Sequence, residues 1–352
     1  MAAVGLEGAA LQGRGAAETV IGRPAVAGAK SSGGAGAPAA LAAATLSVVV
    51  CTHARPDYLR ACLRGLAAQT RRGFELLVVD SASPPEAADA IAALAAAAGA
   101  RLVRADAPGL SLARNLGLRA ARGAWVAYLD DDAVPEPGWA EALFARIAAL
   151  SEAREGGAVA VLGGRIIPFW EDPLPPWWPA GFSGLLTIVE WEGEGEVGTG
   201  AVPPEVEIYG ANMAFAAAPL RAVGGFPEAL GRIGARLLSG EEVEVVARLR
   251  AAGHRALYDG AVAVRHSIQR ERLRPGWLLS RLLWAGVTDA LRDRRHRAAA
   301  RRAVGAAARL ALQAPLLLWP SGSPALLRAR CGAAYNLGYL RGLLAERLDT
   351  AA

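Results

Sequence analysis

Residues 125–132 read Trp125-Val126-Ala127-Tyr128-Leu129-Asp130-Asp131-Asp132, an apolar run that ends in three adjacent carboxylates. A short apolar run of this kind is typical of a strand buried on both faces of a parallel sheet. Three neighbouring carboxylates repel one another unless a cation holds them. Such oxygen ligands suit Mg²⁺ or Mn²⁺, which commonly bridge to substrate phosphates. The stretch predicts a metal site at a strand end, and the alternative is a solvated acidic turn that caps the next helix.

The residues around this stretch alternate between strand and helix patterns. Strands are predicted over 46–51, 74–80, 101–104 and 125–129, and helices over 56–66, 85–98, 110–121 and 139–150. Strict alternation predicts a parallel sheet with helices on both faces. Ligands of such sheets bind at the carboxyl ends of the strands. Polar residues follow the strands at that edge, namely Thr52, Asp80, Asp106 and Asp130 to Asp132.

The second half of the chain lacks the strict alternation of strand and helix patterns. Strands are predicted over 159–167, 206–209, 256–258 and 262–264, and a helix over 241–252. Between the first two strands lies an irregular segment, 168–200, rich in Trp, Pro, Gly and Glu. A loop of that size inside a domain usually serves function. We therefore expect residues 168–200 to carry function.

Composition limits the class of protein. Hydrophobic residues make up 53% of the 352 residues, which excludes global disorder. The net charge is only +5, too balanced for a general nucleic-acid binder. An odd set of three cysteines without a CxxC argues against a disulfide framework, so a reduced, cytoplasmic compartment is the expectation. Residues 1–44 are rich in Ala and Gly and are predicted to be a disordered leader without a signal peptide.

Charge is distributed unevenly along the chain. From Ser267 onward there are 15 Arg against 5 Asp and Glu, a net +10, so the residues before it carry −5. Arginines interleaved with apolar stretches are typical of helices that lie on anionic lipid. Residues 271–352 are thus predicted to be a basic helical extension that contacts a membrane peripherally. The alternative is that these helices pack on the preceding domain or on a second subunit.

Several further residues carry candidate chemistry. Thr52 and Arg55 precede a helix start that could meet phosphate. Asp80 could accept hydrogen bonds from a ligand or could cap the next helix. Glu241 and Glu242 open a helix, where the dipole favours carboxylates regardless of function, and one of them could be a general base.

Two more residues lie in line with the same edge. Arg114, inside a helix, is either a ligand contact or a surface arginine. His266 follows a strand, and it is either structural or completes the metal shell.

Taken in order, these motifs resemble the family 2 glycosyltransferases with the GT-A fold. The matching pieces are Ser47–Thr52 with Arg55-Pro56, Phe74–Asp80, Gly109–Ser111 with Ala113–Asn115, Tyr128–Asp132, Gly210–Phe215, Gly224–Phe226, Gly231-Arg232, Gly240–Glu242 and Gly253. They cover about residues 46–270. The resemblance implies an α/β GT-A domain over 45–270 with a mostly parallel sheet, divided into a donor half over 45–150 and an acceptor half over 151–270. It also implies a metal-dependent, inverting transfer from a nucleotide-diphosphate sugar to a hydroxyl.

The resemblance also implies roles for residues. The Asp130/Asp132 pair takes the place of the DxD motif. Donor contacts would come from Thr52, Arg55, Asp80, Arg114, Asp130 and Asp131, and metal ligands for Mn²⁺ or Mg²⁺ from Asp130, Asp132 and His266. Asp80 would read the nucleobase, which favours UDP or dTDP. Glu242 falls at the position of the base, but Glu replaces the usual Asp, which leaves the choice between Glu241 and Glu242 open.

The acceptor is expected to be a glycan or a lipid-linked molecule at the inner face of the plasma membrane, and no nucleic acid is expected. Candidate acceptor contacts are Trp170, Trp177, Trp178 and Asn212, and the alternative for the aromatic segment is a flap that covers the core. Competing functions are a nucleotidyltransferase, a dehalogenase-like phosphatase and a non-catalytic nucleotide-sugar binder. The segment 52–56 lacks the glycines of a nucleotidyltransferase phosphate loop, and Ala133 stands where a phosphatase would have Thr.

Overall fold

The strand β1 (Leu46–Thr52) lies inside the parallel half of the sheet. It pairs in parallel with β2 (Glu75–Asp80) on one side and with β4 (Trp125–Asp130) on the other, and β2 pairs with β3 (Arg101–Arg104). Every residue of β1 is buried, as its β-branched, apolar sequence predicts for a strand covered on both faces. In the computed structural model of the protein the described residues are 46–152, 157–234, 236–296, 299–317 and 323–344.

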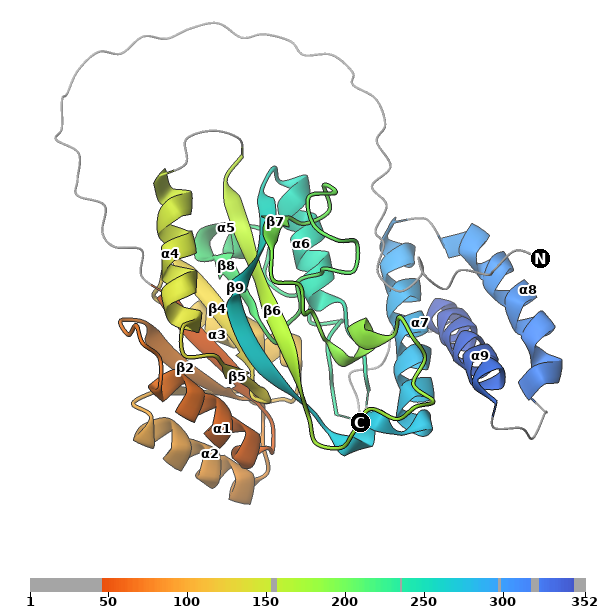
Figure 1. Cartoon of the computed structure of the whole chain (residues 1–352), viewed down its shortest axis with the longest axis horizontal. Helices are drawn as coiled ribbons and strands as arrows, with labels where there is room; N and C mark the ends of the chain where they lie inside the picture. The colour runs from red at the N-terminus through yellow and green to blue at the C-terminus, as the bar shows by residue number, and fades with distance from the viewer. Residues whose placement is uncertain (1–45, 153–156, 235, 297–298, 318–322, 345–352) are drawn as a thin grey trace, which may run out of the picture. The chain divides into compact units, whose positions relative to one another are not determined.

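The second half of the sheet is mixed. Strand β8 (Met213–Ala216) is antiparallel to both β4 and β6 (Val159–Trp170), and β9 (Arg255–Ile268) runs parallel to β6. The short strands β5 (Ala133–Pro135) and β7 (Glu194–Glu196) pair with β9. The strand order is β3-β2-β1-β4-β8-β6-β9-β5, with β7 beside β9 (Figure 1). The mostly parallel α/β sheet is confirmed.

Helices cover both faces of the sheet (Figure 1). They are α1 (Pro56–Ala67), α2 (Pro85–Ala97), α3 (Leu110–Ala120), α4 (Trp139–Glu152), α5 (Ala217–Ala222) and α6 (Glu241–Ala251), with short 3₁₀ turns at Ser183–Leu186 and Arg270–Leu273. Alternate strand residues such as Val49 and Val79 share one core with α3, α5 and α6. Their neighbours Val48 and Val78 are equally buried and point to the face of α1 and α2.

Two strand predictions need correction. Residues 206–209 are not a strand, because Val206 and Asn212 close turns onto the carbonyls of Pro203 and Tyr209, and the strand starts only at Met213. The two short strands expected over 256–264 are parts of the single strand β9, which follows β6 with a register shift at Gly164. Burial of this segment was predicted correctly, but its continuity depends on a β-bulge that the sequence does not announce.

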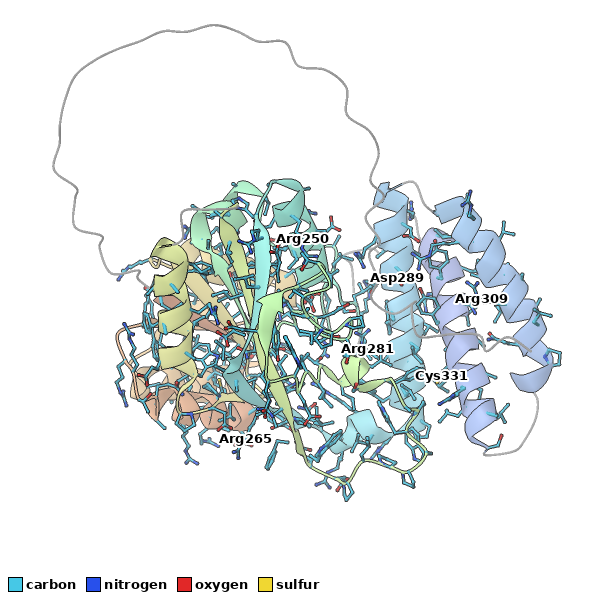
Figure 2. The ribbon with its side chains drawn as sticks, turned by 45° about the horizontal axis from the view of Figure 1, so that its top comes forward. Arg250, Arg265, Arg281, Asp289, Arg309 and Cys331 are labelled. Carbon is cyan, nitrogen blue, oxygen red and sulfur yellow. The ribbon has the colours of Figure 1, made fainter. Side chains whose placement is uncertain are left out.

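The chain continues into three helices, α7 (Pro275–His296), α8 (Ala299–Leu317) and α9 (Pro324–Leu344), and α9 packs against both others. A polar network joins them, and its α7 member Asp289 is labelled in Figure 2. Tyr335 donates to Asp289 at 2.6 Å, Tyr339 donates to Asp293 at 2.7 Å, and Arg302 of α8 pairs with Asp293 at 2.7 Å. Within the described ranges, none of these helices is long and apolar enough to cross a membrane.

The helical extension expected over 271–352 is therefore present as far as Leu344. The contacts of the chain place Ala44–Ala352 in one unit, and a division at residue 270 stays a prediction. The leader expected over residues 1–44 lies outside the described residues.

Two glycines set the approach of α7 to α9. A Cβ on Gly338 would lie 1.9 Å from the Leu283 carbonyl oxygen, and one on Gly286 would lie 2.1 Å from that of Tyr335. Since each obstacle is backbone, the helices would have to move apart. By contrast, a Cβ on Gly276, also in α7, meets nothing within 4 Å.

We therefore expect Gly338→Ala to lower the free energy of unfolding by about 1–3 kcal/mol, because an added methyl forces two packed helices apart. The matched variant Gly276→Ala should leave it unchanged or raise it by up to about 1 kcal/mol. Urea unfolding followed by circular dichroism measures both, and equal midpoints would show that the close approach of α7 and α9 carries no energy.

Candidate active site

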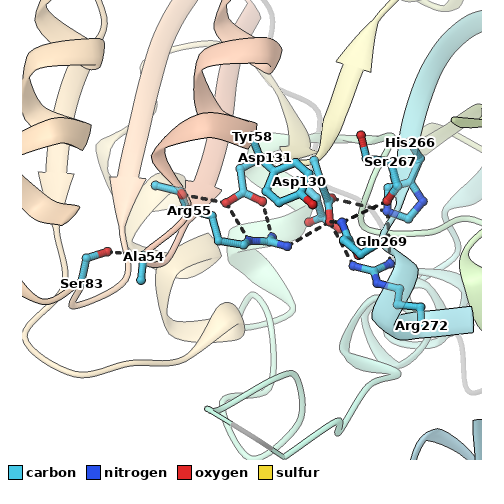
Figure 3. A network of polar contacts seen from close by, with 12 residues as sticks. Ala54, Arg55, Tyr58, Ser83, Asp130, Asp131, His266, Ser267, Gln269 and Arg272 are labelled. Carbon is cyan, nitrogen blue, oxygen red and sulfur yellow. Dashed lines mark hydrogen bonds and ion pairs between the residues drawn. The ribbon is translucent and has the colours of Figure 1, made fainter. Parts of the chain in front are cut away.

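The carboxyl ends of β1, β2 and β4 meet at one edge of the sheet. Thr52 pairs with Asp80, and Cys51 pairs with Asp130, so residues far apart in the chain share this edge. The aspartates that follow β4 turn inward: the side chains of Asp131 and Asp132 are 0% and 2% exposed, whereas that of Asp130 is 26% exposed. Figure 3 shows the contacts that surround them.

Asp131 is held entirely by neighbouring side chains. The Thr52 hydroxyl donates to its Oδ2 at 2.7 Å, Arg55 Nε donates to the same oxygen at 3.2 Å, and Arg55 Nη2 donates to Oδ1. Burial raises the pKa of Asp131, and Arg55 counteracts this. Asp131 thus fixes Arg55, and a direct role of Asp131 in donor binding stays a prediction.

The two carboxylate oxygens of Asp132 differ, because Oδ2 accepts three hydrogen bonds and Oδ1 accepts none. Its Oδ2 accepts from Gln269 Nε2 at 2.9 Å, Arg272 Nη2 at 3.0 Å and Arg55 Nη1 at 3.1 Å. Its Oδ1 is buried with no hydrogen-bond partner, and it lies 3.4 Å from His266 Nε2. Burial alone would raise the pKa of Asp132, yet His266, Arg272 and Arg55 hold it well below its usual range.

The pair of Asp132 Oδ1 and His266 Nε2 fits a divalent cation. Strand pairing brings them together, because Ala133 of β5 lies opposite His266 of β9. An ionised carboxylate and an imidazole are suitable ligands for Mn²⁺. No group of three or more His, Cys, Asp or Glu that could hold a metal occurs in the described part of the chain. A metal here would thus need ligands from the substrate, as Mg²⁺ or Mn²⁺ beside a diphosphate usually has.

Arg114 links Asp130 to the helix start of α6. Its guanidinium is 2% exposed and donates to Glu241 Oε1 at 2.6 Å and to Asp130 Oδ1 at 3.1 Å. Gly210 makes room for it, since a Cβ there would lie 2.0 Å from Arg114 Nη2. Arg114 is therefore an internal cation, not a surface arginine.

The two glutamates at the start of α6 differ in their surroundings. Oε1 of Glu241 pairs with Arg114, whereas Glu242, 8% exposed, has no such ion pair among the described contacts; the Oε2 atoms of both glutamates lack a hydrogen-bond partner. Burial, followed by the charge of Glu241, raises the pKa of Glu242 to about 8. Arg281 of α7 lies near enough to Glu242 for the two charges to interact. A buried carboxyl with a pKa raised in this way can exchange a proton with a substrate near neutral pH.

Asp80 stands apart from this network. It is 1% exposed, accepts from the Ser83 amide at 3.0 Å, and pairs through Oδ2 with Arg104 Nη1 at 3.1 Å. The carboxylate has further lone pairs, so it retains acceptor capacity for a ligand.

The predicted acceptor residues are mainly engaged in packing. Trp170 and Trp178 pack against Leu186, Ile188, Ile268 and Leu273, and Trp177 and Trp178 pack against residues of α7 and α9. Asn212 is 2% exposed, and its amide binds the Trp139 indole and the carbonyls of Arg165 and Val262 at 2.7–3.0 Å. Asn212 therefore joins β6, β9 and α4, and its contact with an acceptor stays a prediction.

Sequence reasoning missed Gln269 and Arg272, which both contact Asp132. They follow His266 by three and six residues, in the turn after β9. Polar residues directly after a buried strand mark Thr52 and Asp80 in the sequence. The strand predicted before Gln269 ends at Val264, whereas β9 runs to Ile268, so Gln269 and Arg272 lie too far beyond the predicted end to be marked in the same way.

Comparison with known proteins agrees with this geometry. Residues 47–190 match the family model described as glycosyl transferase family 2. A glucosyl-dolichyl phosphate glucuronosyltransferase of Haloferax volcanii is 32% identical over 187 residues, which is 53% of this chain and 56% of that protein. The succinoglycan biosynthesis protein ExoM of Rhizobium meliloti is 27% identical over 249 residues, 69% of this chain and 73% of that protein.

Solved structures show the same fold. A mannosyltransferase of Pyrobaculum calidifontis, in complex with GDP-Man and Mn²⁺, superposes with a TM-score of 0.54 at 20% identity, covering 86% of this chain and 88% of that one. Residues 1–349 of TarS from S. aureus, in complex with UDP-GlcNAc, give 0.50 at 17% identity, covering 69% and 66%.

Residues 47–190 therefore resemble glycosyltransferase family 2. The chain as a whole shares the fold of the solved mannosyltransferase. The chain spans about half the length of the first curated relative it matches.

The raised pKa of Glu242 has a consequence for stability. A carboxyl whose folded pKa of about 8 lies above its unfolded value of 4.5 favours folding at low pH, and this contribution is lost as the pH rises through 8. We therefore expect Glu242→Gln, which cannot ionise, to be more stable than the wild type at pH 9 and to lose this advantage toward pH 5. Thermal unfolding of both proteins across this range measures it. A pH-independent difference would mean that Glu242 titrates normally.

Proposed function

We propose that the protein is a metal-dependent, inverting glycosyltransferase that moves a sugar from a nucleotide-diphosphate donor to an acceptor hydroxyl. The observation that carries the proposal is the contrast between two buried carboxyls, Asp132 at the sheet edge and Glu242 at the start of α6. The pKa of Asp132, beside His266, is held well below its usual range, whereas Glu242 has no hydrogen-bond partner at Oε2 and has a raised pKa. Environments that drive two carboxyls apart in pKa assign them to different tasks.

In this proposal Glu242 is the base. A sugar hydroxyl is a weak nucleophile at neutral pH, and a base within hydrogen-bond reach of its proton contributes roughly 10²–10⁴-fold. Glu242 takes the hydroxyl proton while the oxygen attacks the anomeric carbon, and the bond from that carbon to the diphosphate oxygen breaks with its electron pair. One displacement inverts the anomeric configuration. Arg114 holds Glu241, so Glu241 acts as a positioning residue and not as the base.

The donor side uses the residues around Asp132. Asp132 and His266 would hold Mn²⁺ or Mg²⁺, and the bound cation would neutralise charge on the leaving diphosphate. Thr52 and Asp131 keep Arg55 at the same edge, within reach of phosphate. Arg114 orients Asp130 toward the ribose or sugar, and Asp80 accepts from the nucleobase, which favours uracil or thymine because both offer an N–H beside carbonyls.

The experiment that tests the donor site is a thermal-shift panel of UDP, dTDP, GDP and CMP, each with and without Mn²⁺. A ligand present at 100 times its Kd stabilises by about 2.7 kcal/mol, so binding is readily seen. We expect one diphosphate to raise the Tm only with Mn²⁺, and Asp132→Ala to lose this shift. If no nucleotide stabilises the wild type under either condition, the donor site is wrongly assigned.

The same panel separates the transferase from a non-catalytic binder. Glu242→Gln should keep the shift but lower donor turnover about 10²-fold or more, since only the base is removed. Glu242→Asp, which matches the usual residue of the family, is the conservative control and should retain more turnover. Equal turnover in the wild type and Glu242→Gln would assign the base elsewhere.

We also propose that the acceptor is lipid-linked or a membrane-associated glycan, that Trp170, Trp177 and Trp178 border its site, and that the enzyme works peripherally at the inner face of the plasma membrane. The support is one face of α8. Val304 and Leu312 are 73% and 78% exposed, and the further exposed residues on this face are Ala300, Arg301, Ala307, Ala308, Ala311 and Pro315.

The charge of the surrounding helices favours a lipid surface as the partner of this α8 face. Residues 299–344 contain six arginines and no Asp or Glu. Two copies of such a segment would repel each other, whereas an anionic lipid surface would attract the arginines and take up the apolar side chains.

We expect the protein to sediment with phosphatidylglycerol vesicles and far less with phosphatidylcholine vesicles. The double variant Val304→Asp, Leu312→Asp should weaken this binding roughly tenfold or more, because it places charge where the apolar face meets lipid. Ala93→Asp with Ala97→Asp, at exposed sites of α2, is the control of equal charge. Equal binding by both double variants, or a wild-type dimer that only the α8 variant abolishes, would refute lipid as the occupant of this face.

A further inference from the structure

We propose that Arg272 competes with the divalent cation for Asp132 and His266 until a diphosphate draws it away. The metal would then bind the protein–nucleotide complex far better than the free protein, and the nucleotide would bind the protein–metal complex far better than the free protein. The inference rests on the proposed function, since it assumes the donor site described above. It goes beyond that function by assigning to Arg272 a role in coupling the two ligands.

The contacts of Arg272 carry the argument. Its Nη2 lies 3.0 Å from Asp132 Oδ2 and its Nη1 lies 3.5 Å from His266 Nε2, so one guanidinium reaches both residues that would hold the metal (Figure 3). The Arg272 side chain is 8% exposed, and Asp132 and His266 are each 2% exposed. Charges buried this deeply are screened little by solvent.

The guanidinium of Arg55 adds a second positive charge beside Asp132, which further opposes the binding of a cation. Arg55 Nη1 lies 3.1 Å from the same Asp132 oxygen. A divalent cation placed between Asp132 Oδ1 and His266 would therefore enter beside two positive charges that already neutralise the carboxylate. The free site should bind a metal poorly, because like charges held close together in a buried site are costly.

A nucleoside diphosphate changes this balance. Its oxygens can accept the guanidinium hydrogen bonds and complete the metal's shell at the same time. Once Arg272 turns to phosphate, Asp132 is left to the cation. Such coupling is reciprocal: whatever factor the diphosphate adds to metal affinity, the metal adds to diphosphate affinity.

Arg272 is a cleaner probe than Arg55. Removing Arg55 would strip Asp131, which is 0% exposed, of the cation that pairs with it in the described part of the chain, and folding would suffer. Arg272 leaves behind an Asp132 that still accepts from Gln269 and Arg55. Arg270, two residues earlier and 58% exposed, is the matched control for loss of one positive charge.

The experiment is a titration of the full chain with Mn²⁺, with free Mn²⁺ read by electron paramagnetic resonance, first alone and then with UDP or the diphosphate that the thermal panel selects. We expect Arg272→Gln to bind Mn²⁺ alone at least about fivefold more tightly than the wild type, and to show a smaller gain on adding the diphosphate. Arg272→Lys keeps the charge and should resemble the wild type, as should Arg270→Gln. Circular dichroism and Tm check that each variant folds.

The outcomes separate this inference from the proposed function. If the wild type binds Mn²⁺ and diphosphate together, but Arg272→Gln binds Mn²⁺ alone no better than the wild type does, the coupling role of Arg272 is refuted while the transferase stands. An equal gain in Arg272→Gln and Arg270→Gln would reduce the effect to general charge and also refute it. If no diphosphate binds with Mn²⁺ to the wild type, the proposed function fails, whereas the comparison on Mn²⁺ alone still decides whether Arg272 competes with the metal.

Discussion

The burial of two adjacent carboxylates, Asp131 and Asp132, is the constraint on which the site depends. Placing two like charges in a poorly solvated region is costly unless cations lie beside them. The chain supplies them from different directions: Arg55 comes from the turn before α1, and Arg272 comes from the turn after β9. The turn before α1 and the turn after β9 are thereby both joined to the end of β4. The ion pairs that neutralise the two aspartates therefore also hold the site together.

A second ion network, built in the same way, explains the region around α6. Arg114 is 2% exposed and bridges Asp130 and Glu241, so the strand end and the helix start are held at a fixed separation. Gly210 is needed where the backbone passes the guanidinium, because any side chain would collide with it. The glycine that precedes Ala211-Asn212 in the sequence therefore serves Arg114, and Asn212 itself serves the packing of β6 against β9. These motif residues support the site without facing it.

The sequence predicted the donor half well because its signals are local. The β-branched run of β1, the spacing of Leu59, Cys62, Leu63 and Leu66 in α1, and the aspartates after β4 each depend on neighbours in the chain, and the structure confirms the elements they mark.

The second half of the domain was harder to predict from the sequence. Continuity of β9 depends on a bulge opposite Gly164, and the turn at 206–212 buries Ile208 and Tyr209 as a strand would. Hydrophobicity therefore indicated burial there but not conformation. Gln269 and Arg272 were missed for the same reason, since their place follows from where β9 ends. Which glutamate lacks a partner also could not be read from adjacent, identical residues, because Arg114 comes from 127 positions away.

Asp132 and Glu242, the two carboxyls of the proposed reaction, are both buried but differ in how far nearby cations offset the effect of burial on the pKa. Burial acts on Asp132 and Glu242 alike and raises the pKa of each. At Asp132 nearby cations more than offset it, so the pKa lies well below its usual range. At Glu242 the charge of Arg114 lowers the pKa only in part, because Arg114 is engaged by Glu241 and Asp130, so the raised pKa persists. The side chain that decides the difference is thus Arg114: by pairing with one glutamate it leaves the other basic enough to take a proton. A base built this way needs no histidine, and its strength depends on how completely Arg114 remains with its neighbours when a donor enters beside Asp130.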